Sequence, residues 1–267
     1  GQKRFSLEGL EATVPALDAL IDAAADAGVE DVVIGMAHRG RLNVLANIMQ
    51  KPAQNIFTEF DGKDYSDVSD SFDGDVKYHL GYTSEKTTPS GKSIKLNLAP
   101  NPSHLETVGA VIEGVTRAKQ DKLYANDFSK VLPIALHGDA AIAGQGIVYE
   151  IVQMSKLRAY QTAGTIHVVL NNQVGFTTSN KDARSGVYST EIAKVVAAPV
   201  LHVNADDTEA AVEAMLFAIA YRMEFKEDVF IDLVGYRKYG HNEGDEPRFT
   251  QPILYKLISK HQNARNI

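Results

Sequence analysis

An acidic residue and an amide residue, each at the end of an apolar run, are the strongest indication of chemistry in this sequence. Asp139 ends one such run, and Asn172 ends the next, 33 positions later. That separation matches one strand–helix–strand crossover, which would bring both side chains to the same carboxyl edge of a parallel sheet. A carboxylate oxygen, an amide oxygen and a backbone carbonyl, for which we choose Val174, suit Mg²⁺. The pattern therefore predicts a magnesium site formed by Asp139, Asn172 and Val174.

Small residues around Asp139 favour close approach of a ligand. Gly138 permits a sharp turn, and Ala140 and Ala141 leave the backbone accessible. We expect the helix that follows to direct free N–H groups at a phosphate. Asp139 would repel that phosphate unless a cation lies between the two anions. A structural interpretation stays open, because Asp after Gly is often a helix N-cap and Asn-Asn after a strand is often a turn.

Five of the eight histidines lie at predicted strand ends or in nearby loops, namely His38, His79, His104, His137 and His241. Histidine and arginine at one rim would suit an anionic substrate that also exchanges protons, and Arg39 could bind a phosphate or carboxylate with two hydrogen bonds. For each histidine taken singly, a structural role is the simpler interpretation. We interpret the remaining three, His167, His202 and His261, as packing or surface residues.

The elements that would position these residues alternate between short apolar runs and stretches of helical period, which is typical of a parallel α/β sheet. Strands are predicted at Asp31–Met36, Ile94–Leu98, Val131–His137, Thr165–Asn171, Val200–Asn204 and Asp228–Tyr236. Helices are predicted at Leu7–Ala27, Arg41–Met49, His104–Leu123, Gln145–Arg158, Thr208–Phe225 and Pro252–His261. The polar stretches 61–92 and 173–189 are expected to be functional or disordered loops. We therefore expect one α/β domain over residues 1–267, with helices flanking a parallel sheet.

Composition excludes several classes of function. The 267 residues carry a net charge of -7, so no basic field is available for a nucleic acid. The sequence contains no cysteine, which excludes disulfides and thiolate chemistry, and no apolar run long enough for a membrane helix. Asp139 beside His137 could indicate a hydrolase, but no Gly-x-Ser-x-Gly, His-Glu-x-x-His or Walker motif accompanies the pair. Because residue 1 is Gly rather than Met, we expect a fragment of a longer protein.

Six sequence blocks together resemble one enzyme family. They are Met36-Ala-His-Arg-Gly-Arg-Leu-Asn43, Asp75-Val-Lys-Tyr-His-Leu-Gly81, Asn101-Pro-Ser-His-Leu-Glu106, His137-Gly-Asp-Ala-Ala141, Asn171-Asn-Gln-Val-Gly-Phe-Thr-Thr178 and Gly240-His-Asn-Glu243. Their series resembles the E1 component of the thiamine-diphosphate-dependent 2-oxo acid dehydrogenases, and within that family the 2-oxoglutarate type. The resemblance runs from about Arg4 to His261. It covers the diphosphate-binding half of such an enzyme and implies the thiamine-diphosphate-binding fold.

The resemblance implies a role for each matching residue. The magnesium ligands would again be Asp139, Asn172 and Val174. Contacts to thiamine diphosphate are implied for Arg39, Ser103, Leu105, Asp139, Ala140, Ala141, Asn172 and His241. Substrate handling is implied for His38, His79 and Ser103. Arg184 and Ser185 lie in a loop that resembles a cofactor-ordered loop of the family, although a solvated charged loop explains them equally well.

The implied activity is oxidative decarboxylation of 2-oxoglutarate, with transfer of the succinyl group to a lipoyl-bearing E2 component. The family's pyrimidine-binding domain and its N-terminal region for complex assembly would lie outside residues 1–267, so we expect this chain alone to be inactive. A homodimer is expected for the full enzyme, in the bacterial cytoplasm or the mitochondrial matrix, with neither a nucleic acid nor a membrane as partner. Three alternatives stay open: a 2-oxoadipate dehydrogenase E1, another thiamine-diphosphate enzyme, and a non-catalytic module of the same fold.

Overall fold

A seven-stranded sheet forms the centre of the molecule in the computed structural model, which describes residues 4–60 and 79–267. The strands of this sheet are β1 (Asp31–Met36), β2 (Tyr82–Thr87), β3 (Ser93–Leu98), β4 (Val131–Gly138), β5 (Ile166–Asn171), β8 (Val200–Asn204) and β9 (Val229–Val234). Their order is β2-β3-β1-β4-β5-β9-β8. The pairs from β3 to β8 are parallel, and only β2 runs antiparallel to its neighbour. The predicted α/β class and parallel sheet are confirmed.

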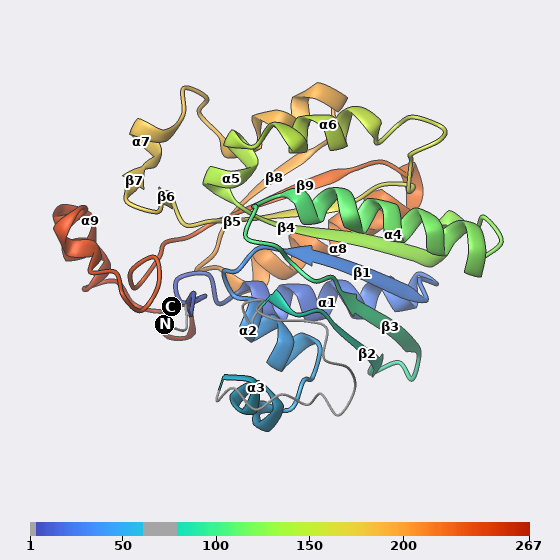
Figure 1. The fold of residues 1–267 in the computed structure, drawn as a ribbon, viewed down its shortest axis with the longest axis horizontal. Coiled ribbons are helices and arrows are strands. Elements are labelled where there is room, and N and C mark those ends of the chain that lie inside the picture. Colours follow the sequence, from blue (N-terminus) through green and yellow to red (C-terminus); the bar gives the residue numbers. More distant parts are fainter. Residues whose placement is uncertain (1–3, 61–78) are drawn as a thin grey trace, which may run out of the picture.

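Helices cover both faces of the sheet, so the domain has three layers (Figure 1). One face is covered by α1 (Thr13–Asp26) and α8 (Thr208–Phe225), which pack against each other. The other face is covered by α4 (Thr107–Leu123), α5 (Asp139–Gly144), α6 (Gly146–Met154) and the 3-10 helix η4 (Ser189–Val196). The remaining elements are α2 (Arg41–Asn43), η1 (Val44–Ile48), α3 (Ala53–Phe60), η3 (Phe128–Lys130), β6 (Val174–Gly175), β7 (Thr178–Ser179), α7 (Asn180–Ala183), η5 (Pro247–Phe249), α9 (Pro252–Ile258) and η6 (Ala264–Asn266).

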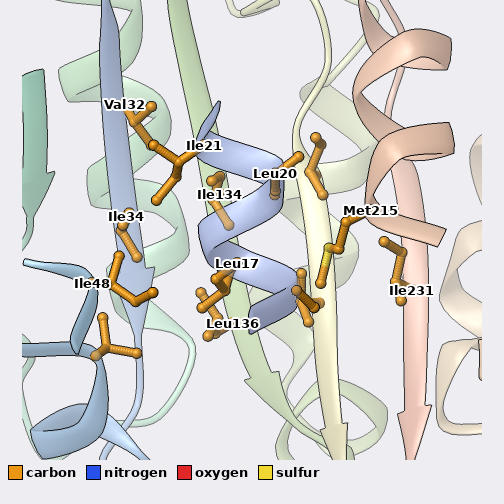
Figure 2. Close-up of a cluster of buried hydrophobic side chains, with 14 of the residues drawn as sticks. Leu17, Leu20, Ile21, Val32, Ile34, Ile48, Ile134, Leu136, Met215 and Ile231 are labelled. Carbon is orange, nitrogen blue, oxygen red and sulfur yellow. The ribbon is translucent and has the colours of Figure 1, made fainter. Parts of the chain in front are cut away.

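The largest hydrophobic core lies between the sheet and the layer formed by α1 and α8. Helix α1 directs Leu17, Leu20 and Ile21 toward the sheet, and all three are fully buried. Figure 2 shows these side chains beside Ile34 of β1 and Ile134 of β4. Because β1 and β4 lie inside the sheet with helices on both faces, both strands are apolar along nearly their whole length.

Several elements differ from the sequence prediction. Strand β2 lies in a stretch predicted to be loop, of which residues 61–78 are outside the described residues. Helix α5 begins directly at Asp139, where a small-residue turn was predicted before a helix at Gln145. Helix α4 begins at Thr107 rather than at His104, because Glu106 has a φ of 73°. Helix α3 was not predicted, and the loop 173–189 contains β6, β7 and α7.

No helix of the described ranges 4–60 and 79–267 is both long enough and apolar enough to cross a membrane.

A cluster of polar side chains ties α4 to the segment before β5 at the amino end of the sheet. Glu113 accepts hydrogen bonds from the hydroxyls of Thr162 at 2.8 Å and Thr165 at 2.5 Å. Burial, together with the nearby Asp228 carboxylate, raises the pKa of Glu113 to about 7 despite these donors. Glu113 is therefore a carboxyl group whose protonation is coupled to folding.

Glu113→Gln is expected to flatten the pH dependence of stability. The folded-state pKa lies above the ordinary value of 4.5, so the stabilising contribution of Glu113 is present below pH 4.5 and is lost as the pH rises to about 7. Wild type should lose on the order of 2 kcal/mol relative to the variant over this range. Urea unfolding between pH 4.5 and 8 measures the difference. The exposed carboxylate of Glu150 provides the control Glu150→Gln, and equal pH profiles for wild type and both variants would contradict the prediction.

Candidate magnesium and diphosphate site

A cavity opens at the carboxyl edge of β4 and β5, where the sequence places Asp139 and Asn172. The two strands are parallel neighbours, with Gly138 in register with Leu170, so their carboxyl ends lie together as predicted. The cavity is lined by Met36, Ala37, His38, Arg39, Leu105, Leu136, His137, Gly138, Asp139, Ala140, Ala141, Leu170, Asn172, Val174, Gly175, Phe176 and His241. All three predicted magnesium ligands are therefore in the wall of one cavity.

The three predicted ligands form a compact and buried group. Asp139 is 3% exposed and begins α5, while Asn172 is 7% exposed and follows β5 directly. The side-chain oxygen of Asn172 accepts a hydrogen bond of 3.2 Å from the backbone N–H of Val174, which folds the turn after β5. This turn places Asn172 and Val174 in the wall of the same cavity as Asp139. Oxygen donors with a single carboxylate fit a small hard cation that also keeps phosphate or water ligands.

Electrostatics at Asp139 favour a positively charged partner. Burial raises the pKa of this carboxyl group, and the Arg184 guanidinium opposes the rise. The nearest Arg184 nitrogen lies 3.7 Å from the carboxylate. A buried carboxylate needs a compensating positive charge, so a cation is the ligand that this position fits. Within the described part of the chain, no three His, Cys, Asp or Glu side chains are grouped so that they could hold a metal. The candidate ligands Asp139, Asn172 and Val174 differ from such a group, because they combine one carboxylate with an amide oxygen and a backbone carbonyl.

Small residues line part of the cavity and leave its backbone accessible. Ala140, Ala141 and Gly175 line it, and a Cβ atom on Gly175 would lie 2.7 Å from the Cβ of Ala140. Such a contact is too close for two carbon atoms, so glycine is required where β6 passes α5. Ala140 and Ala141, near which the sequence predicts close approach of a ligand, both lie in this wall.

Two histidines form one side of the cavity within an aromatic group. The ring centroids of His38 and His241 are 5.5 Å apart at an interplanar angle of 82°. Phe5 packs on His38 at 3.8 Å, and Phe176 packs edge-on against His241 at 4.8 Å. Of the five histidines predicted near strand ends, His38, His137 and His241 line the cavity.

Arg39 lies in the cavity wall but directs its hydrogen bonds to the backbone. Its guanidinium donates to the carbonyl of Ser6 at 2.8 Å and to the carbonyl of His241 at 3.0 Å. Burial lowers the pKa of Arg39 to about 10, so the group stays positively charged at neutral pH. Arg39 therefore holds two segments together and adds positive charge beside the cavity.

A buried chain of polar side chains supports the wall behind His137. Its Nδ1 atom lies 2.5 Å from the carboxylate of Glu106, and its Nε2 atom lies 3.0 Å from Nδ1 of His167. Glu106 thereby fixes the loop that carries Leu105, which also lines the cavity. His167 stacks on Phe230 at 4.2 Å, in agreement with its interpretation as a packing residue. His202 and His261 instead contact the carboxylates of Asp232 and Asp206.

Three predicted site residues lie outside this cavity. His79 is buried near the end of β3, and its carbonyl accepts a hydrogen bond from the backbone N–H of Asn101. Ser103 and His104 are exposed in the loop before α4. The roles implied for His79 and Ser103 stay predictions, because neither residue is among those that line the cavity.

Sequence reasoning missed several residues in or beside the wall. Phe176 was quoted only as part of a block and Phe5, which packs on His38 and His241 of the wall, was not quoted at all, because a lone aromatic residue gives no signal of a site. Gly175 was quoted as part of a block, but its close approach to Ala140 depends on the path of β6. Arg184 was left off the list of site residues, although its distance to Asp139 places it there.

Comparisons with known proteins give the family of the chain. The model of the family Dehydrogenase E1 component matches residues 1–266. A 2-oxoglutarate dehydrogenase E1 component of Cupriavidus necator is 51% identical over 100% of this chain, and one of Azotobacter vinelandii is 53% identical over 100% of it. The mitochondrial 2-oxoglutarate dehydrogenase of Dictyostelium discoideum is 51% identical over 97% of this chain. The chain belongs to the dehydrogenase E1 component family.

The chain spans only part of each of these relatives. It covers 28% of the two bacterial proteins and 26% of the mitochondrial one. Activities, substrates and partners of the whole relatives therefore come to this chain only as proposals.

Proposed function

We propose that this chain forms the magnesium- and diphosphate-binding part of a 2-oxoglutarate dehydrogenase E1 component. The family is thiamine-diphosphate dependent. The observation that carries the proposal is the cavity at the carboxyl edge of β4 and β5, with Asp139, Asn172 and Val174 in its wall. The names of the relatives support 2-oxoglutarate over 2-oxoadipate as the substrate.

In this proposal, one group of residues holds the metal ion and a second group adjoins the diphosphate. Asp139, Asn172 and the carbonyl of Val174 hold Mg²⁺, which neutralises the diphosphate that Asp139 alone would repel. Ala140 and Ala141 let the diphosphate approach the backbone, while buried Arg39 contributes positive charge. Thiamine diphosphate, when bound, supplies an electron sink for decarboxylation.

The histidines provide the proton chemistry of the proposed site. His38 and His241 place imidazole rings in the cavity wall, where a ring nitrogen can hold or release a proton near neutral pH. The aromatic contacts of Phe5 with His38 and of Phe176 with His241 hold the two rings in position. His79 and Ser103 stay proposed substrate contacts that require a part of the site beyond this cavity.

The remaining parts of the enzyme are proposed to lie outside residues 1–267. These parts are the pyrimidine-binding domain and the region for complex assembly, so the chain alone would not turn over 2-oxoglutarate. The full enzyme would be a homodimer that transfers the succinyl group to a lipoyl-bearing E2 component. The small share of each relative that this chain covers supports this division.

Calorimetric titration of the full-length protein with thiamine diphosphate tests the proposal. Binding is expected in the presence of Mg²⁺ and is expected to disappear when the ion is removed with a chelator, because the diphosphate would then meet Asp139 without a cation. Readdition of Mg²⁺ should restore binding. Binding of equal strength with and without the ion, or no binding under either condition, would sink the proposal.

A further inference from the structure

Strand β9 carries one charged residue, Asp232, in an otherwise apolar sequence. The residue is 1% exposed and lies in register with His202 of the edge strand β8 and with Val169 of β5. Its Oδ1 atom accepts a hydrogen bond of 2.9 Å from the side-chain amide of Asn171, and its Oδ2 atom lies 2.8 Å from Nδ1 of His202. An apolar residue in place of a buried charge is often neutral or stabilising, so packing does not explain the acid at this position.

The contact with Asp232 orients the side chain of Asn171, the last residue of β5. Because the amide nitrogen of Asn171 faces the carboxylate, its Oδ1 atom is left to accept a hydrogen bond of 3.2 Å from the backbone N–H of Gln173. Gln173 has a φ of 65°, which residues other than glycine rarely adopt. Its own side-chain amide donates to the carbonyl of Gly235 at 2.8 Å. Side-chain hydrogen bonds therefore hold the turn after β5 in an unfavourable backbone conformation.

The same turn carries two of the three proposed magnesium ligands. The side-chain oxygen of Asn172 accepts a hydrogen bond from the backbone N–H of Val174, and both residues line the cavity. Two successive hydrogen bonds, one between Asp232 and Asn171 and one between Asn171 and the backbone of Gln173, connect the buried carboxylate of β9 with this turn.

From this chain of contacts we propose that Asp232 is a positioning residue for the cation site, which acts through Asn171 to fix the turn that presents two of the ligand oxygens. The inference rests on the proposed function, because the cation site is part of it. When the acceptor at Asp232 is removed, the amide of Asn171 loses the partner that orients it, and the turn can relax from the positive φ at Gln173. Loss of a residue that only holds metal ligands in place weakens metal binding by about 10–100-fold.

The charge of Asp232 is a second route to the same site. Burial raises the pKa of Asp139, and the Asp232 carboxylate adds to this rise, so its field reaches the proposed ligand. Two substitutions separate charge from position. Asp232→Asn removes the charge but keeps an oxygen that accepts from Asn171, and its new amide can donate to His202 once the imidazole proton is on Nε2. Asp232→Leu has a similar volume and removes both the charge and the acceptor.

The first measurement is Mn²⁺ binding to the full-length protein in the presence of thiamine diphosphate, followed by the electron paramagnetic resonance of the free ion. Asp232→Leu is expected to bind Mn²⁺ about 10–100-fold more weakly than wild type, and Asp232→Asn as tightly as wild type. Asp228→Asn is the matched control and should leave the affinity unchanged, because Asp228 is a buried acid directly before β9 that accepts the N–H of Thr165. Equal losses in the two Asp232 variants would show that charge alone acts and would overturn the positioning role.

A double-mutant cycle tests whether the effect passes through Asn171. Asn171→Ala is expected to weaken Mn²⁺ binding by a similar factor, and the double variant Asn171→Ala/Asp232→Leu by no more than either substitution alone. The double variant also keeps the test valid if the single variants unfold, because it removes both partners of the hydrogen bond rather than one. Thermal unfolding shows which variants are folded. Losses that add in the double variant, or wild-type affinity in the folded double variant, would overturn the proposal.

The remaining outcomes distinguish this inference from the proposed function. Equal Mn²⁺ affinities of wild type and Asp232→Leu would overturn the role of Asp232 but leave the cation site intact. Absence of Mn²⁺ binding to the wild-type protein would overturn the cation site itself, and the role of Asp232 with it.

Discussion

Asp139→Ala in the full-length protein is expected to lower the affinity for thiamine diphosphate in the presence of Mg²⁺ by at least about a hundredfold. Asp139 is the single carboxylate of the proposed ligand set, and loss even of groups that only support metal ligands costs about 10–100-fold. Without it the cation loses its only anionic protein ligand, and the diphosphate loses the ion that binds it. Calorimetric titration at saturating Mg²⁺ measures the change.

The same substitution should leave the fold intact. Burial raises the pKa of the Asp139 carboxyl group, so its removal relieves a desolvated acid, but it also leaves Arg184 without its ion-pair partner, and the two effects oppose each other in the melting temperature. Asp182→Ala serves as the control, because Asp182 is an exposed carboxylate on α7, where its side chain accepts a hydrogen bond from Ser179. Near-normal cofactor binding by Asp139→Ala, or loss of binding through unfolding, would contradict the assignment.

Arg222→Ala is expected to destabilise the protein by about 3–5 kcal/mol, because truncation of a large buried side chain leaves a cavity and buried carbonyls lose their donor. Arg222 is fully buried on α8, and its guanidinium donates to the carbonyls of Gly164, Phe128, Val131 and Thr162. These carbonyls belong to the chain segments that enter β4 and β5. Their loss of a common donor would loosen the amino ends of the two strands that carry the site.

Chemical denaturation gives the size of this effect. Glu224→Ala removes a charged side chain from an exposed position of the same helix and should change stability by no more than about 0.5 kcal/mol. Arg222→Lys should recover only a part of the loss, because an ammonium group cannot span four carbonyls as a guanidinium does. An Arg222→Ala variant as stable as the Glu224→Ala control would refute the role of Arg222.

The buried elements could be predicted from the sequence because burial leaves a clear pattern. Strands Asp31–Met36 and Val200–Asn204 and helix Thr208–Phe225 have the predicted bounds. The helix begins after Asp207, whose side chain accepts a hydrogen bond from the N–H of Ala210. Because Asp is a preferred residue at the N-cap, the start of this helix could be predicted from the local sequence. Continuous apolar runs likewise mark strands that are covered on both faces.

Edge and site elements could not be predicted in the same way. Strand β2 is polar and largely exposed, and its conformation comes from pairing with β3 rather than from its own residues. The run from Asp139 to Gly144 contains small residues, which were interpreted as a turn although alanine favours helix. The loop before α4 ends at Glu106, whose positive φ depends on its contact with His137 across 31 residues.

In the candidate site, too, residues at the ends of regular strands could be predicted, whereas residues on irregular segments could not. Asp139 and Asn172 were placed together by the regular geometry of two parallel strands, which is fixed by the fold class. Arg184, Phe5 and His79 depend instead on the paths of irregular segments, which no periodic pattern encodes. The backbone hydrogen bonds of Arg39 could not be foreseen either, since they join Arg39 to Ser6, 33 positions away, and to His241, 202 positions away.

The joining of the first and last parts of the chain at the cavity has a consequence for folding during synthesis. The carbonyl of Phe5 accepts a hydrogen bond from Gly40, and the N–H of Arg4 donates to the side chain of Glu243 at 2.6 Å. Before the ribosome has made the segment around His241, Phe5 and His38 can already meet, but the surface that His241 supplies does not yet exist. The aromatic side of the cavity is therefore among the last features of this domain that a nascent chain can complete.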